Sequence, residues 1–349
     1  MSQIIDAIVN RADRGQPLAV CVLAKTRGST PQKAGAIMLV TADGQTLGTI
    51  GGGCTEAEAR TEALRALTRP SDRPAETTDD GAILADRLLR FELNHDYGWD
   101  DGLVCGGVMH VVVQVIDRLE AADAWRHAQH ELAVGRPART RLRVTNEHGE
   151  LVELTHEAEP RPSLIIAGGG HVGQALAAIA DPAGFDVTVV DDRADTVSAA
   201  RFPDARRVVG EIEAELRKLT LHDHSYVVIV TRGHKHDGQA LEAVIRSDAR
   251  YIGLIGSRRK VLAIYETLLA QGVSPDQLRR VHAPIGLRIG AVSPEEIAVS
   301  IAAELIAVRH DQPLNTTHAM RLDGQLLDQL IDRQVGVNAA ATDPARPSP

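Results

Sequence analysis

Two cysteine–glycine turns carry the residues of this sequence that are best suited to chemistry. The first, Gly51-Gly52-Gly53-Cys54, follows a predicted strand and precedes a helix predicted to start near Thr55. At a helix N-terminus, the dipole and the free backbone N–H groups favour the thiolate form of a cysteine. Three successive glycines exceed what a turn requires, so we interpret the segment as a ligand site where a planar or anionic group lies against bare backbone. The alternative is a tight turn with an incidental buried cysteine.

The second turn is Cys105-Gly106-Gly107, which again precedes a predicted strand. Two cysteines cannot complete a structural zinc site, because such a site takes four ligands. Thiolates suit a transition metal or the handling of sulfur, and we therefore predict that Cys54 and Cys105 form a paired thiol site. Cys21 lies within an apolar run and is predicted to be a core residue.

A loop with basic and hydroxyl side chains follows the first predicted strand. It comprises Lys25–Pro31 and includes Arg27. Basic groups, hydroxyls and a glycine are typical of anion-binding loops, particularly those that bind phosphate. A solvated turn is the alternative interpretation.

The second half of the chain opens with a glycine-rich turn. Gly168, Gly170 and Gly173 match G-x-G-x-x-G between an apolar strand and a helix, and the next strand ends at Asp191, at the spacing expected for a ribose-binding carboxylate. The pattern predicts a Rossmann unit. A dinucleotide bound at this turn is a separate hypothesis, and His171 would face the same crevice.

Two further loops follow predicted strands, and in a parallel sheet they lie at the edge where ligands bind. The first contains Arg232, His234, His236 and Asp237. Its histidines could ligate a metal or transfer protons, whereas in the alternative interpretation Asp237 only caps a helix predicted over Gly238–Arg246.

The second of these loops ends in a predicted helix start. Ser257 suits an N-cap, and Arg258 and Arg259 beside it make an anion-binding site.

Length and composition indicate a globular protein of two domains. The chain has 349 residues and a net charge of −9, which argues against nucleic acid or an anionic membrane as the principal partner. The amphipathic N-terminus lacks the apolar core of a signal peptide, and no segment is long enough to span a membrane. Three cysteines do not indicate a disulfide framework, so we expect a cytoplasmic location.

The predicted elements divide at the segment Glu157–Ser163. Residues 1–156 show an α+β pattern, and residues 163–312 alternate strands with helices, which predicts a doubly wound parallel sheet. Residues 313–349 form a C-terminal extension that we expect to be disordered from about residue 338.

Taken in order, these motifs resemble the XdhC/CoxI family, the accessory proteins of molybdenum-cofactor hydroxylases. The matching segments run from near residue 20 to near residue 310. In the first half they are RGSTPQKAGAIML, IGGGCTEAEA and LVCGG; in the second half they are AGGGHVGQALA, VVDDR, RFPDA, TRGHKHD, YIGLIGSRRK and HAPIGLRIGAVSPEEIAVSIAAE.

The resemblance implies an N-terminal XdhC/CoxI domain followed by a Rossmann-like domain. It implies a chaperone, without turnover of its own, that binds molybdenum cofactor, supports its sulfuration by a cysteine desulfurase partner and delivers it to an apo molybdenum hydroxylase such as xanthine dehydrogenase. By the same resemblance, Cys54 and Cys105 contact the cofactor and its molybdenum.

Two other functions stay open at this point. In the first, an NAD(P)-dependent oxidoreductase uses His234 or His236 as acid and base, and Asp191 holds a ribose; the cysteine–glycine turns would then have no role. In the second, the Rossmann domain senses a nucleotide or recognises a dinucleotide form of the cofactor. The residues also leave the oligomeric state open, and a homodimer is one option.

Overall fold

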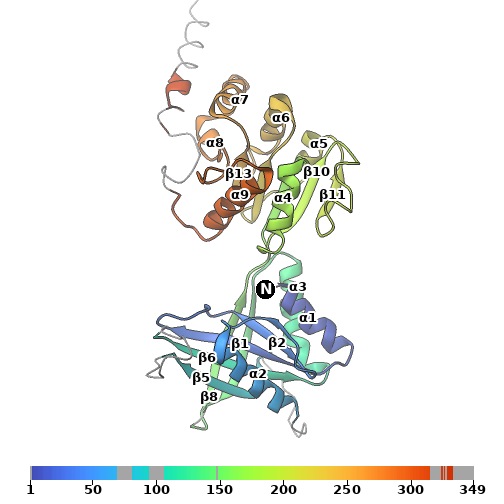
Figure 1. Cartoon of the computed structure of the whole chain (residues 1–349), viewed down its shortest axis with the longest axis vertical. Helices are drawn as coiled ribbons and strands as arrows, with labels where there is room; N and C mark the ends of the chain where they lie inside the picture. The colour runs from blue at the N-terminus through green and yellow to red at the C-terminus, as the bar shows by residue number, and fades with distance from the viewer. Residues whose placement is uncertain are drawn as a thin grey trace, which may run out of the picture. The chain divides into compact units, whose positions relative to one another are not determined.

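The computed structural model describes residues 2–68, 81–93, 106–146, 148–314, 324, 326 and 328–332; of Ser2, His234 and Lys235 it describes the backbone alone. The chain divides into two compact units, Met1–Arg161 and Pro162–Pro349, which Figure 1 shows from blue to green and from green to red. Over the described stretches, no helix combines the length and the apolar composition that crossing a membrane requires.

The first unit contains a five-stranded and a three-stranded sheet. The larger sheet has the order β3-β2-β1-β6-β5 with all neighbours antiparallel, and the smaller has the order β4-β7-β8. The elements in chain order are α1 (Ser2–Asp13), β1 (Leu18–Arg27), β2 (Ile37–Thr41), β3 (Thr46–Gly48), α2 (Gly53–Leu67), β4 (Ile83–Leu84), β5 (Arg87–Glu92), β6 (Val108–Ile116), the 3-10 helix η1 (Glu120–Ala122), α3 (Asp123–Ala133), β7 (Ala138–Thr145) and β8 (Leu151–Ala158).

Both faces of the larger sheet are covered. Because side chains alternate between the two faces of a strand, Val20 and Val22 of β1 join one core with α1 and α3, and Cys21 and Leu23 join another with α2. The continuous apolar run at the start of β1 in the sequence reflects this double burial.

The second unit is a parallel α/β fold. Its sheet has the order β11-β10-β9-β12-β13, and all neighbouring strands are parallel. The elements in chain order are β9 (Ser163–Ala167), α4 (His171–Ala180), β10 (Asp186–Asp191), β11 (Arg206–Val209), α5 (Ile212–Arg217), β12 (Ser225–Ile229), α6 (Gly233–Val244), β13 (Tyr251–Leu254), α7 (Arg258–Ala270), α8 (Pro275–Arg279) and α9 (Pro294–Arg309).

Helices pack on both faces of this parallel sheet. Side chains of α5, α6, α7 and α8 form the core on one face, and those of α4 and α9 form the core on the other. Figure 1 shows α4 and α9 side by side on the face toward the viewer. Chain order reverses between β9 and β12, which makes the carboxyl ends of these two strands the topological switch point of the fold.

The predicted fold class is confirmed: an α+β unit precedes a Rossmann-like unit with a parallel sheet. The helix predicted around Gly238–Arg246 is present but starts earlier than predicted, since α6 runs from Gly233 to Val244. Glycine and histidine are weak helix formers, so propensity alone gave no sign that the first turn of α6 forms over them. The extension expected to be disordered from residue 338 lies outside the described residues.

We predict that Gly168→Val destabilises the second unit. Gly168 has φ +119°, and an ideal Cβ there would lie 2.5 Å from the Val230 carbonyl oxygen. The strain should cost about 2 kcal/mol or more of unfolding free energy, measured by chemical denaturation. Gly170→Ala is the matched control, because φ there is −66° and no other atom lies within 4 Å of a Cβ. Equal stability of the two variants would contradict this account.

Candidate functional site

In the first unit, the segment predicted to bind an anion, Lys25–Pro31, packs against the glycines of both cysteine–glycine turns. An ideal Cβ on Gly107 would lie 2.2 Å from the carbonyl oxygen of Ser29 and 2.8 Å from that of Arg27. A Cβ on Gly51 would lie 2.9 Å from Cβ of Pro31. Three motifs that are 20 to 80 residues apart in the sequence therefore meet at one end of the larger sheet.

The turn before Cys54 has a backbone that suits only glycine. Gly51, Gly52 and Gly53 have φ values of 129°, 73° and 64°, all in the left-handed region. A Cβ on Gly52 or Gly53 would meet no atom within 4 Å. The backbone conformation of the turn therefore requires these glycines, and the space beside Gly52 and Gly53 is open.

Glu56, which sequence reasoning did not single out, holds this turn in place. One oxygen of its carboxylate, Oε2, accepts hydrogen bonds from Gly52 N at 3.0 Å, Ile50 N at 3.2 Å and Thr49 Oγ1 at 2.5 Å. Burial raises the pKa of Glu56, but these hydrogen bonds lower it by more, so its pKa lies below the ordinary value. The anion therefore satisfies backbone N–H groups of the turn that precedes α2, including that of the N-cap residue Gly52.

The described cysteines have opposite environments. Cys54 is exposed, in the first turn of α2. Cys21 is fully buried, and burial together with the charge of Glu56 raises the pKa of its thiol to about 12, which makes it inert. The predicted core position of Cys21 is confirmed. Cys105 lies outside the described residues, so its pairing with Cys54 stays a prediction; its neighbour Gly106 has φ +63°.

A row of basic side chains crosses three neighbouring strands at the same end of the sheet. Lys25 of β1 lies opposite His110 of β6, which lies opposite Arg90 of β5. Arg27, the exposed last residue of β1, lies opposite Val108 of β6, which in turn lies opposite Glu92 of β5. Glu92 forms an ion pair with Arg90 and so compensates part of the positive charge. Burial and the charges of Lys25 and Arg90 lower the pKa of His110. Sequence reasoning placed Lys25 and Arg27 in a loop, whereas both lie in β1, and it did not identify His110 or Arg90.

This basic row is on the sheet face opposite α2. His110 alternates with Met109 and Val111, which pack under α2, and shares its face with Val112, which packs toward α1 and α3. Nδ1 of His110 is buried and has no hydrogen-bond partner among the described residues. Among the described residues, no cluster of three or more histidine, cysteine or acidic side chains is arranged to hold a metal ion.

In the second unit the glycine turn is packed as the sequence predicts for a Rossmann unit. Gly168 lies against the end of β12, and a Cβ on Gly173 would lie 2.1 Å from the carbonyl oxygen of Gly168, so α4 packs closely on β9. Gly170 has open space beside it, and His171 is the exposed first residue of α4. This end of the helix is where a phosphate would be bound.

Asp191, the predicted ribose ligand, is engaged within the protein. It is 2% exposed, and its carboxylate accepts hydrogen bonds from Gly169 N at 2.8 Å and from N, Nε and Nη2 of Arg193 at 3.0 to 3.1 Å. Burial raises the pKa of Asp191, but these hydrogen bonds, first that of the Arg193 side chain, lower it by more. A ribose diol would have to displace Arg193. Its role as a ribose ligand stays a prediction.

Other charges at this edge are also paired. Arg232, at the end of β12, contacts the carboxylate of Asp192, after β10, at 3.3 Å. Asp237 is fully buried, accepts a hydrogen bond from the Thr231 hydroxyl at 2.5 Å and forms an ion pair with Lys260. Asp237 thus lies inside α6 and joins it to α7, which corrects the alternative that it caps the helix.

The remaining predicted residues of this edge are spread over two helix starts. Ser257 caps α7 and accepts a hydrogen bond from Lys260 N, and Arg258 and Arg259 in the first turn are exposed. His236 is exposed, and the side chain of His234 lies outside what the structure describes. The described partners of Asp191 are Gly169 and Arg193, and do not include Ser257, Arg258, Arg259 or His236.

A buried polar network was missed by sequence reasoning. Glu304 of α9 is fully buried and accepts hydrogen bonds from the Tyr251 hydroxyl at 2.6 Å and Gly286 N at 2.7 Å; its other oxygen lies 3.1 Å from Nδ1 of His282. Burial raises the pKa of Glu304, but the interactions with His282, Tyr251 and Gly286 lower it by more. The partners are 18 to 53 residues away, so no local pattern reveals them.

Comparison with known families agrees with this architecture. The sequence model of the XdhC and CoxI family matches residues 11–76, and that of the XdhC Rossmann domain matches residues 164–305. The chain belongs to the XdhC/CoxI family. The resemblance inferred from the motifs is therefore confirmed.

Three curated relatives of this XdhC-family chain cover most of it. The uncharacterized protein YqeB of Escherichia coli is 31% identical over 300 residues, which are 85% of this chain but only 44% of YqeB. A Bacillus subtilis protein, named as a probable xanthine dehydrogenase subunit, is 25% identical, covering 88% of this chain and 96% of the relative. The molybdenum cofactor insertion chaperone PaoD of E. coli is 24% identical, covering 85% of both.

A solved structure shares the fold of this XdhC-family chain. It is the crystal structure of a xanthine dehydrogenase from Bacillus halodurans, with a TM-score of 0.74 and 24% identity. The match covers 90% of this chain and 97% of that one.

We predict that Glu304→Gln destabilises the protein in a pH-dependent way. Because the pKa of Glu304 is lowered on folding, its charge contributes stability above the ordinary value of 4.5, and this contribution is lost as the pH falls through the lower folded value. At pH 7 the variant should lose about 3 kcal/mol. The difference in unfolding free energy from wild type should shrink as the pH falls below 4.5. A difference that stays constant over this range would contradict the proposed network.

Proposed function

We propose that this protein is a chaperone that binds molybdenum cofactor as its cargo, supports the sulfuration of the cofactor and delivers it to an apo molybdenum hydroxylase. The observation that carries the proposal is the meeting of three motifs in the first unit. The loop Arg27–Gln32 packs against Gly51 on one side and Gly107 on the other, next to an exposed thiol at Cys54.

The residues at this end of the sheet fit the chemistry of the cargo. The exposed Cys54 would supply a soft thiolate to molybdenum or to its sulfur donor, and Cys105, if it pairs with Cys54 as predicted, would supply a second. Gly52 and Gly53 offer backbone without side chains, against which a flat pterin would lie. Arg27 would provide charge-assisted hydrogen bonds to the phosphate of the cofactor, with the neighbouring glycines of the turns completing the contact surface.

The names of the relatives support this class of function. PaoD is named as a molybdenum cofactor insertion chaperone, and the B. subtilis relative as a probable subunit of xanthine dehydrogenase. We infer that the acceptor of the cargo is a hydroxylase of the xanthine dehydrogenase type. A cysteine desulfurase would supply the sulfido ligand, and the chain itself would turn over no substrate.

The oxidoreductase alternative receives no support from the second unit. A nicotinamide enzyme of this fold uses the acid at the end of the second strand to bind ribose. Here the carboxylate of Asp191 already accepts hydrogen bonds from Gly169 N and from the side chain of Arg193. His236 lies in the first turn of α6, and within the described part of the chain no acid is hydrogen-bonded to it to orient it for proton transfer. The chaperone assignment therefore depends on the first unit.

We predict that both Cys54→Ala and Cys105→Ala lose the cargo. Wild-type protein purified from cells that synthesise molybdenum cofactor should carry stoichiometric pterin and molybdenum, measured by pterin fluorescence after oxidation and by elemental analysis. Cys21→Ala is the matched control: it removes a buried thiol, so it should lower the melting temperature but retain the cargo. Wild-type protein without pterin but with tightly bound NAD(H) would overturn the proposal in favour of the oxidoreductase.

Arg27→Ala is expected to weaken the binding of molybdenum cofactor by about tenfold, because one charge-assisted hydrogen bond to phosphate is lost. The measurement is quenching of intrinsic fluorescence on titration with the isolated cofactor. Arg139→Ala is the control, since Arg139 is an exposed arginine of β7 that forms an ion pair with Glu157. Equal affinities of the two variants would mean that Arg27 belongs to a solvated turn.

A further inference from the structure

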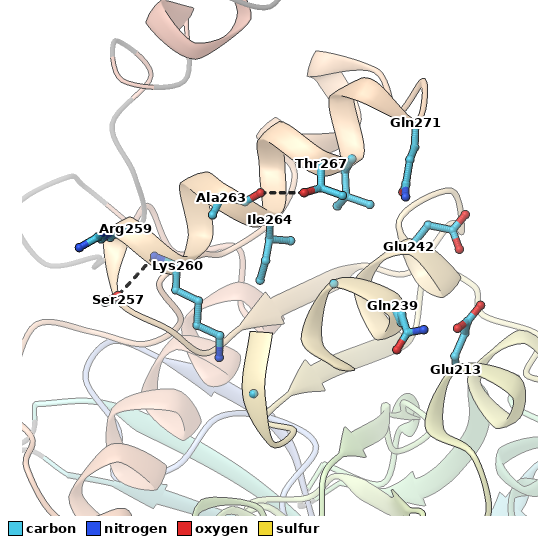
Figure 2. Close-up of a pocket in the computed structure, with 13 residues that line it drawn as sticks. Glu213, Gln239, Glu242, Ser257, Arg259, Lys260, Ala263, Ile264, Thr267 and Gln271 are labelled. Carbon is cyan, nitrogen blue, oxygen red and sulfur yellow. Dashed lines mark hydrogen bonds between the residues drawn. The ribbon is translucent and has the colours of Figure 1, made fainter. Parts of the chain in front are cut away.

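The second unit has an open groove between helices α6 and α7, well away in sequence from its glycine turn. The groove has a volume of about 1300 Å³, which is ample for a ligand of nucleotide size. Gly238 of α6 and Ala263, Ile264 and Leu268 of α7 form its apolar part. Figure 2 shows Lys260, Ile264 and Gln271 extending from α7 toward this space.

Gly238 is a residue that the fold does not require. It lies within α6 and its φ is not in the left-handed region, so any residue could adopt its backbone conformation. A Cβ there would meet only Ile264 Cγ2, at an ordinary contact distance of 3.9 Å. Glycine is among the weakest helix formers. Gly238 thus lowers helix stability without a packing reason, and it leaves the backbone of the groove wall open to close approach by a ligand.

One end of the groove favours an anion. Gly233 and Ser257, where α6 and α7 begin, both line it, together with Arg259 and Lys260. Three consecutive cations, Arg258 to Lys260, occupy the first turn of α7, where they oppose the helix dipole. Lys260 is paired with the buried Asp237, which leaves the exposed Arg258 and Arg259 and the helix start to attract negative charge; of the two arginines, Arg259 lines the groove.

The opposite end offers hydrogen-bonding groups whose charges are already paired. Gln239, Gln271 and the two carboxylates Glu213 and Glu242 line it, and the carboxylates form ion pairs with Arg217 and Arg246. Amide and carboxylate groups suit the polar edge of a heterocyclic base. The order along the groove is therefore cationic, apolar and then hydrogen-bonding.

From this order we infer that the groove binds a nucleoside diphosphate. The phosphates would lie at the starts of α6 and α7 beside Arg259, the ring would lie over Gly238, and the base edge would meet Gln239 and Gln271. This site differs from the crevice in which a Rossmann fold ordinarily holds a dinucleotide, because no residue of Gly168–Gly173 lines the groove. The inference does not depend on the cargo bound by the first unit.

Isothermal titration of the full-length chain with ADP, GDP, CDP and UDP tests the site. At least one of the four should bind with micromolar affinity, and inorganic pyrophosphate should bind more weakly. Gly238→Leu places a side chain in the groove and should weaken nucleotide binding by about tenfold or more. Because leucine is a better helix former than glycine, the melting temperature should be equal to or above that of wild type. The double variant Arg258→Ala and Arg259→Ala, which changes only exposed side chains, should weaken binding to a similar extent.

A variant of the glycine turn provides the matched control. Gly170→Gln places a side chain in the open space of the crevice, where no atom lies within 4 Å of a Cβ, and should leave nucleotide binding unchanged. Failure of all four nucleotides to bind would overturn the inference. Binding that is lost in Gly170→Gln but survives in Gly238→Leu and in the double arginine variant would also overturn it, because the nucleotide would then occupy the crevice.

Discussion

Close backbone approach at glycine is the constraint on which the proposed cofactor site depends. A Cβ on Gly107 would overlap the carbonyl oxygens of Ser29 and Arg27, and a Cβ on Gly28 would lie 3.1 Å from the oxygen of Gly106. Side chains at these positions would push the loop off the end of the sheet. The loop could then no longer contact both the turn before Cys54 and the turn after Cys105. The arrangement of the site is thus set by the absence of side chains.

The second unit follows a different principle, in which charges at the carboxyl edge of the sheet are paired with one another. Arg193 donates hydrogen bonds to the carboxylate of Asp191, Arg232 contacts Asp192, and Lys260 forms an ion pair with the buried Asp237. A Rossmann topology therefore does not by itself imply a nicotinamide enzyme, since function belongs to the site and not to the fold. The groove between α6 and α7 differs from this edge because its cations exceed its acids at one end.

Much of the fold could be predicted from local sequence patterns. The strands β1 and β9, the glycine turn and the capping box that begins α9 at Ser293 are all properties of neighbouring residues. The start of α6 could not be predicted, because three residues of its first turn, a glycine and two histidines, are weak helix formers. The turn is stabilised from outside by the contacts of Asp237 with Thr231 and Lys260.

The sequence by itself determined the two kinds of fold, the family, and the residue types available to the site. These follow from periodicity, from glycine spacing and from the ordered motifs, all of which act over short distances along the chain. Only the tertiary structure decided which residues meet: that Lys25 and Arg90 flank His110, that Glu304 joins His282 and Tyr251, and that Asp191 accepts a hydrogen bond from Gly169 N. Strand register and helix packing set those contacts, and both depend on burial summed over the whole unit.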